Sequence, residues 1–184
     1  MFMHAGRPWM RLSLAFAFAL AALTATAAEK APAFRTVTWD ALVPKDWDPM
    51  ASFKGVDMGQ FIDGDPRANE MMKKLRAVWD NAPTNPAVVG QAVRIPGFVV
   101  PLEETKDGLK EFLLVPYFGA CIHSPPPPAN QIVHVVLSAP QRLRTMDAVW
   151  ASGTLRVQRQ DSSMGVSGYS MQGLKVEPYV DGGK

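Results

Sequence analysis

The feature that most constrains the fold is a series of short strand-like segments in the second half of the chain. They cover residues 92–100, 111–117, 132–138, 153–159 and 166–179. In the fourth segment, Leu155 and Val157 alternate with polar residues, as expected of a strand with one buried face. Short strands that follow one another without long intervening helices predict a small β-barrel.

Turn signals divide and interrupt these segments. Lys106-Asp107-Gly108 lies between the first two segments and predicts a hairpin, because Asp-Gly favours tight turns. Inside the first segment, Pro96-Gly97 predicts a bulge or sharp bend that interrupts the strand. Residues 144–151 predict either a short helix or the lead-in to the next strand.

One helix is predicted ahead of the barrel. Asp65 is a favourable N-cap, and Pro66 suits the first helical position. An apolar stripe then follows the helical spacing, at Met71, Leu75, Val78 and Trp79. Pro83 and Pro86 prevent the helix from continuing. We interpret this amphipathic helix as a packing element, because its stripe is narrow and its charges are mixed.

Residues 29–65 are predicted to form an irregular N-terminal arm. The aromatic residues Trp47, Phe53 and Phe61 lie among polar and glycine residues there. Such residues either attach an irregular segment to the surface of a domain or form an exposed patch for a partner. The predicted organisation is therefore a signal peptide over residues 1–28, the arm over 29–65, and a helix with a barrel over 66–184.

The N-terminal residues predict export. Arg7 and Arg11 precede an apolar run over residues 12–23, and small residues follow at 24–28, as in a cleavable Sec-type signal peptide. The run is shorter than the roughly 20 apolar residues of a membrane span, and the alternative is an uncleaved signal anchor. No Cys lies near the cleavage site, which disfavours a lipid anchor. We expect a soluble periplasmic protein without a transmembrane segment after cleavage.

Cleavage would also change the charge of the protein. The whole chain has 19 Lys and Arg against 17 Asp and Glu. Loss of Arg7 and Arg11 leaves 17 basic residues against the same 17 acidic ones, so the mature chain is close to neutral. A neutral chain lacks the overall positive charge typical of nucleic-acid binders, and no nucleic-acid partner is expected.

The one cysteine excludes an intrachain disulfide framework and a four-thiolate zinc site. Cys121 lies two residues before His123 and shortly before four prolines at 125–128, which favour a stiff polyproline II connection. Three hypotheses remain open for Cys121: a small buried hydrophobe, a metal ligand together with His123, or a reactive thiol. Cys and His suit Zn(II) or Cu(I), which makes these the candidate metals.

His134 is a remote third candidate ligand. It lies in the third strand segment between Val133 and Val135, so we interpret it as a buried or half-buried histidine with a hydrogen-bond partner. Glu103 and Glu104 follow a strand end and are expected to be solvated. No Ser-His-Asp or Cys-His-Asn spacing and no phosphate-binding glycine loop occur in the sequence, so no catalytic or cofactor-binding residue is predicted.

Several strings of the sequence carry a family resemblance. They are residues 39–44, 95–103 and 112–123, the prolines at 125–128, and 130–133, with Gly-Ala-Cys-Ile-His at 119–123 as the most specific. Together they resemble an uncharacterised family of proteobacterial envelope proteins, known only as a domain of unknown function. The resemblance covers about residues 36–180. It implies an OB-like arrangement of strands and a periplasmic accessory role, because members are often encoded beside macrolide-exporter-type ABC transporters in settings linked to zinc supply.

The predicted fold class is therefore mostly β (α+β), a five-stranded OB-like barrel with one amphipathic helix and an irregular arm. The preferred functional hypothesis is an accessory binding protein of an envelope transport or metal-homeostasis system. Cys121 and His123 would lie in its functional loop, and an ABC transporter component is the candidate partner. One alternative is a thiol-dependent or redox enzyme using Cys121. The other is a purely structural protein-interaction module. The sequence assigns no reaction.

Overall fold

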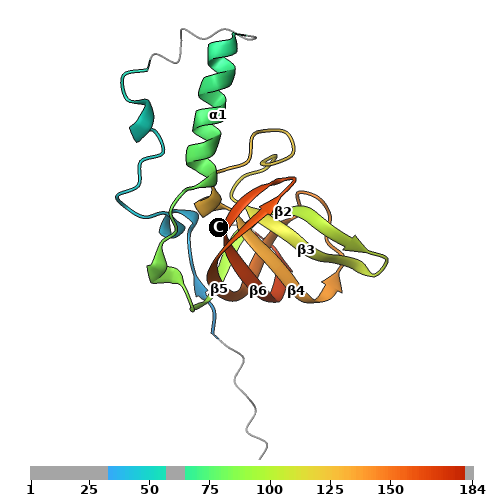
Figure 1. Cartoon of the computed structure of the whole chain (residues 1–184). Coiled ribbons are helices and arrows are strands. Elements are labelled where there is room, and N and C mark those ends of the chain that lie inside the picture. Colours follow the sequence, from blue (N-terminus) through green and yellow to red (C-terminus); the bar gives the residue numbers. More distant parts are fainter. Residues whose placement is uncertain (1–32, 57–64, 181–184) are drawn as a thin grey trace, which may run out of the picture. The chain divides into compact units, whose positions relative to one another are not determined.

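The structure is a computed structural model that describes residues 33–56 and 65–180 (Figure 1). Its strands are β1 (Arg35–Thr36), β2 (Ala92–Thr105), β3 (Gly108–Val115), β4 (Val133–Gln141), β5 (Ala148–Ser162) and β6 (Gly165–Pro178). Its helix is α1 (Pro66–Asp80), and its short 3-10 helices are η1 (Trp39–Leu42), η2 (Ala51–Phe53), η4 (Pro86–Val88) and η5 (Ala129–Gln131).

The strands β2 to β6 close into a barrel. Their order is β2-β3-β4-β6-β5, and β5 pairs back to β2. The β4–β6 pair is parallel, whereas the other pairs within the barrel are antiparallel. This is the five-stranded Greek-key arrangement of an OB-like barrel. The predicted mostly β fold is confirmed.

The prediction that Pro96-Gly97 interrupts the first strand is wrong. β2 is continuous, and Pro96 pairs with Trp150 of β5. The strand instead changes neighbours at Phe98, since residues before it pair with β5 and residues after it pair with β3. The register shifts lie further along, between Pro101 and Glu104. A Cβ on Gly97 would lie 2.8 Å from the carbonyl oxygen of Val115, so glycine lets β3 approach where β2 changes partners.

Two further predictions concern the turn at residues 106–108 and the segment 144–151. Thr105 pairs with Gly108 across Lys106 and Asp107, which confirms the hairpin. Of the two alternatives for residues 144–151, the lead-in to a strand is correct, because β5 begins at Ala148.

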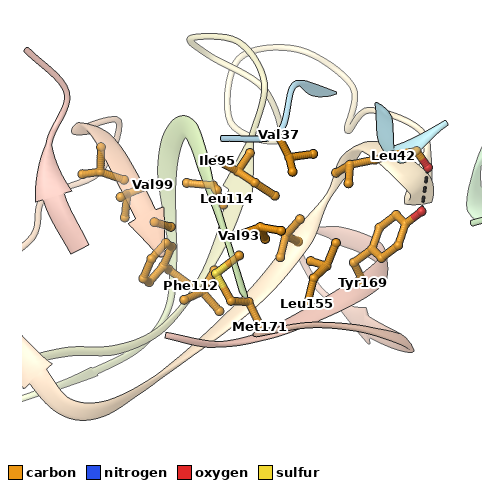
Figure 2. Packing of buried hydrophobic residues seen from close by; sticks show 14 of the residues in the cluster. Val37, Leu42, Val93, Ile95, Val99, Phe112, Leu114, Leu155, Tyr169 and Met171 are labelled. Atoms are coloured by element: carbon orange, nitrogen blue, oxygen red, sulfur yellow. Dashed lines mark hydrogen bonds between the residues drawn. The ribbon is translucent and has the colours of Figure 1, made fainter. Parts of the chain in front are cut away.

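The interior of the barrel holds the main hydrophobic core (Figure 2). Inward-facing positions alternate along each strand, as at Val93 and Ile95 of β2 or Phe112 and Leu114 of β3. A second cluster lies outside the barrel and consists of Val100, Leu113, Val115, Ala120 and Ile132. We call it the outer cluster. Because β3 contributes to both, its two faces are buried.

The first part of the arm is attached to the barrel through a buried tyrosine. The Tyr169 hydroxyl donates a hydrogen bond to the carbonyl oxygen of Leu42 at 2.6 Å (Figure 2). The same hydroxyl accepts a hydrogen bond from the backbone N–H of Asn85 at 2.5 Å. Of the predicted aromatic attachments, Trp47 packs against the domain and Phe53 is buried, whereas Phe61 lies outside the described residues.

Helix α1 begins as predicted, with the Asp65 carboxylate accepting a hydrogen bond from the backbone N–H of Arg67 at 2.8 Å. Its apolar stripe is only half-buried, and no residue of the helix is fully buried. A specific contact comes from Arg76, which donates a hydrogen bond to the carbonyl oxygen of Pro126 at 3.0 Å. No helix in the described ranges is long and apolar enough to cross a membrane.

Candidate functional site

The turn that carries Cys121 lies between β3 and η5. The carbonyl oxygen of Gly119 organises it by accepting hydrogen bonds from the backbone N–H groups of Ile122, His123 and Ser124, at 3.3, 2.8 and 3.2 Å. Cys121 has φ +66°, in the left-handed region that side-chain-bearing residues seldom adopt. Met146 holds the start of the turn, since its sulfur accepts a hydrogen bond from the backbone N–H of Gly119 at 3.2 Å.

The Cys121 side chain is half-buried and packs against the outer cluster. Burial raises the pKa of the Cys121 thiol to about 11, and the positive charge of Arg76 opposes this shift only in part. The group is therefore a neutral thiol at physiological pH. A nucleophilic or redox cysteine requires the opposite shift, toward a thiolate. This environment favours the hypothesis of a packed cysteine over that of a reactive one.

The raised pKa predicts slow alkylation of Cys121 in the folded protein. We expect iodoacetamide to label it much more slowly at pH ~8 than an unfolded thiol, whose pKa is about 8.5. The native rate should keep rising toward pH 11, where the folded thiol ionises. Mass spectrometry of native and guanidinium-unfolded samples measures both rates. Equal rates at pH ~8 would contradict a buried thiol.

The same pKa shift predicts how stability depends on pH. Between the unfolded and folded pKa values, the unfolded chain releases the thiol proton while the folded chain retains it. The contribution of Cys121 to the free energy of unfolding is therefore present below about pH 8.5 and is lost as the pH rises.

The histidines lie in different environments. His123 is exposed on the turn, two residues from Cys121. His134 is 8% exposed, and its Nε2 lies 3.2 Å from a carboxylate oxygen of Glu111. The interpretation of His134 as a buried histidine with a partner is confirmed, and so is the exposure of Glu103 and Glu104.

A metal site would require more ligands than the turn supplies. In the parts of the chain that the structure describes, no three side chains of His, Cys, Asp or Glu gather closely enough to hold one metal ion. Cys121, His123 and His134 therefore do not form a three-ligand group. Binding of Zn(II) or Cu(I) by the pair of Cys121 and His123 stays a prediction.

A pocket of about 250 Å³ lies beside the point where β2 changes neighbours. Its lining residues are Trp39, Pro96, Gly97, Phe98, Pro116, Ala148 and Tyr179. The indole N–H of Trp39 donates a hydrogen bond to the carbonyl oxygen of Pro96 at 2.7 Å, which fixes this ring in the wall. The Tyr179 ring packs against Trp150 with a centroid distance of 5.3 Å. Three of the seven lining residues are thus aromatic, and two of these rings, those of Trp39 and Tyr179, are held by these contacts.

Exposed aromatic residues continue this pocket onto the Cys121 turn. Phe118 is 67% exposed, and its ring contacts the pocket residue Phe98 edge to face at 5.8 Å. Tyr117 is 44% exposed, and it follows the pocket residue Pro116 in the chain. We call the pocket together with Tyr117 and Phe118 the aromatic surface. Exposed apolar patches of this kind commonly mark sites of interaction.

Sequence reasoning identified the Cys121 turn but missed the aromatic surface. The residues of the aromatic surface come from the arm, β2, the segment after β3, the start of β5 and the C-terminal end of the described chain. Only the fold brings these segments together. A local signal did exist, because Phe98 and Tyr117 each lie within two residues of a proline, in segments that connect or redirect strands.

A family model described as a protein of unknown function, DUF3299, matches residues 39–178. The chain belongs to the DUF3299 family. The match runs from the start of η1 to the end of β6, so it includes the barrel and the aromatic surface up to Pro178. The predicted membership of a family of unknown function is confirmed.

A solved DUF3299 structure is similar to this chain. It is the crystal structure of a DUF3299 family protein from Pseudomonas aeruginosa PAO1, with 36% sequence identity and a TM-score of 0.65. The similarity covers 83% of this chain and 100% of that one. A comparison of this DUF3299 protein with curated proteins finds no match.

Proposed function

We propose that this protein is exported to the periplasm and serves there as an accessory binding module for a protein of an envelope transport system. The observation that carries the proposal is the aromatic surface, in which an apolar pocket continues into exposed Tyr117 and Phe118. The positively charged start, apolar run and small residues at the N-terminus support export. The family resemblance supports the envelope transport system as the source of the partner.

The contacts that hold the side chains of the aromatic surface support protein recognition. Binding costs less conformational entropy when the contacting side chains are already ordered. Trp39 is held by its hydrogen bond to Pro96, and Phe118 is supported by the ring of Phe98. Buried aromatic residues are frequent energetic centres of protein interfaces, and covering one such ring contributes about 1.5–3 kcal/mol.

The proposal predicts a position-specific contact with a partner. A photo-crosslinking amino acid in place of Phe118, in cells that export the protein, should give a discrete adduct with an envelope protein. Mass spectrometry then identifies that protein. The matched control is Val157 on β5, which is 50% exposed and lies outside the pocket lining. The adduct should be lost with Tyr179→Ala, which removes one wall. The same adduct from position 157, or none from 118, would refute the proposal.

Metal binding in the Cys121 turn is the second candidate function. Cys121 and His123 lie on one short turn, in which the carbonyl oxygen of Gly119 accepts three backbone hydrogen bonds. This shared, ordered turn favours the candidate. Loss of Zn(II) or Cu(I) binding in Cys121→Ser and His123→Ala, relative to the wild type, would support this candidate. It involves different side chains from the aromatic surface, so each function is tested without the other.

A further inference from the structure

A second cavity, of about 390 Å³, lies between the arm and the loop that leads into β4. Its lining residues are Asp40, Val43, Pro44, Lys45, Trp47, Pro49, Pro128 and Gln131. One wall thus comes from η1 and the arm between η1 and η2, and the other from η5 and the proline run. The volume lies within the range of small-ligand sites, about 300–1,000 Å³. None of these residues lines the pocket of the aromatic surface.

Trp47 forms a fixed aromatic wall in this cavity. Its side chain packs against a small cluster formed by Ala82, Ala129 and Val166, which holds the ring in place. The ring is nevertheless only partly buried, and the residue lines the cavity. Its indole N–H has no hydrogen-bond partner among the described residues. The cavity lining therefore includes an aromatic side chain whose N–H donor has no partner among the described residues.

The polar side chains of the cavity are also unused. Asp40 supplies a carboxylate, Lys45 an ammonium group and Gln131 an amide, and none of them forms a hydrogen bond or ion pair with another described side chain. The nearby acid Asp48 differs, since its carboxylate contacts Lys54 at 3.4 Å and accepts a hydrogen bond from the backbone N–H of Met50. The lining of the cavity thus offers donors and acceptors that have no partner among the described side chains.

We infer that this cavity binds a hexose ring of a glycan. A pyranose has an apolar face of C–H groups, which fits a tryptophan ring, and a rim of hydroxyl groups, which need donors and acceptors together. Asp40 accepts from hydroxyls, Lys45 donates to them, and the Gln131 amide does both. The opposite charges of Asp40 and Lys45 disfavour ligands with a large net charge of either sign. The inference does not depend on the proposed protein partner.

The experiment uses the mature chain with cellobiose and N,N′-diacetylchitobiose as probes. Proton–nitrogen NMR follows the indole signals. We expect one sugar or both to shift the Trp47 indole signal in a saturable way at concentrations up to about 10 mM, as for a weak single-site ligand. The combined variant Asp40→Asn with Gln131→Ala alters exposed or half-exposed groups and should weaken binding about tenfold. Trp47→Leu should abolish binding, which is followed in this variant by the backbone amide signals of the lining residues Lys45 and Gln131.

The control variant is Phe118→Ala, which removes the exposed ring of the aromatic surface. It should bind the sugar as the wild type does, while losing contacts to a protein partner. The inference is overturned if neither sugar produces a saturable shift. It is also overturned if the combined variant at Asp40 and Gln131 binds as tightly as the wild type.

Discussion

Replacing Gly153 by alanine is expected to lower the free energy of unfolding by about 3 kcal/mol or more. Gly153 is buried in β5, at a register shift between β5 and β6. An added Cβ would overlap the carbonyl oxygen of Gln172 and lie 2.7 Å from the side chain of Met171. The nearest obstacle is backbone in the paired strand, so β5 and β6 would have to separate. Urea unfolding followed by tryptophan fluorescence measures the loss.

The control for this variant is Gly90→Ala. Nothing lies within 4 Å of a Cβ at Gly90, so the substitution creates no overlap. Gly90 has φ +75°, and an L-residue there costs about 1–2 kcal/mol. Gly153→Ala should therefore be clearly the less stable of the two, or yield no folded protein while Gly90→Ala folds. Equal loss in both variants would mean that the contact between β5 and β6 is not limiting.

The alternation of apolar residues predicted the barrel because one face of each strand must point inward. It could not predict which outward faces are also covered. Residues 112–115 are all apolar, and periodicity alone leaves open whether they form a strand buried on both sides. In the fold, Phe112 and Leu114 fill the barrel, while Leu113 and Val115 meet Ala120 of the Cys121 turn. Residues 112–115 are therefore all apolar because the Cys121 turn folds back over the outer face of β3.

The prediction at Pro96-Gly97 failed for a related reason. Proline and glycine are local signals of interruption, and the first half of β2 contains both. Whether a strand ends there depends on its neighbours, and β2 has β5 on one side before Phe98 and β3 on the other side after it. Pro96 and Gly97 therefore lie beside a change of pairing partner inside one continuous strand. Such a change depends on the closed barrel, so a short window of sequence cannot predict it.

The chemistry of Cys121 was equally undecided by sequence, because burial and nearby charges set the pKa of a thiol. Arg76, the charge that acts on Cys121, lies in α1, far away in the chain. The candidate glycan site is also formed by residues far apart in the chain, since Asp40 and Gln131 line one cavity only when the arm packs beside η5. The packing of the arm therefore controls both cavities, because Trp39 lines one and Trp47 lines the other.

Because both cavities depend on the packing of the arm, Tyr169→Phe is the second substitution with a large expected effect. Tyr169 is completely buried, and its hydroxyl joins the carbonyl oxygen of Leu42 to the backbone N–H of Asn85. Phenylalanine fills the same space but leaves both backbone groups without this partner. A fully buried polar group left unpaired costs about 1–3 kcal/mol, and Leu42 is completely buried while Asn85 is half-buried. We therefore expect the free energy of unfolding to fall by about 2–4 kcal/mol. Urea unfolding monitored by circular dichroism measures it.

The matched control is Tyr117→Phe. The Tyr117 hydroxyl makes a long, weak hydrogen bond of 3.5 Å to the carbonyl oxygen of Pro125, and the side chain is 44% exposed. Its loss should change the stability by less than about 0.5 kcal/mol. Hydrogen exchange adds a local readout, since amides of the arm around Leu42 should exchange faster in Tyr169→Phe than in the control. If the two variants have the same stability and the same exchange, the buried hydroxyl does not hold the arm. The walls that Trp39 and Trp47 contribute to the two cavities would then depend on other contacts.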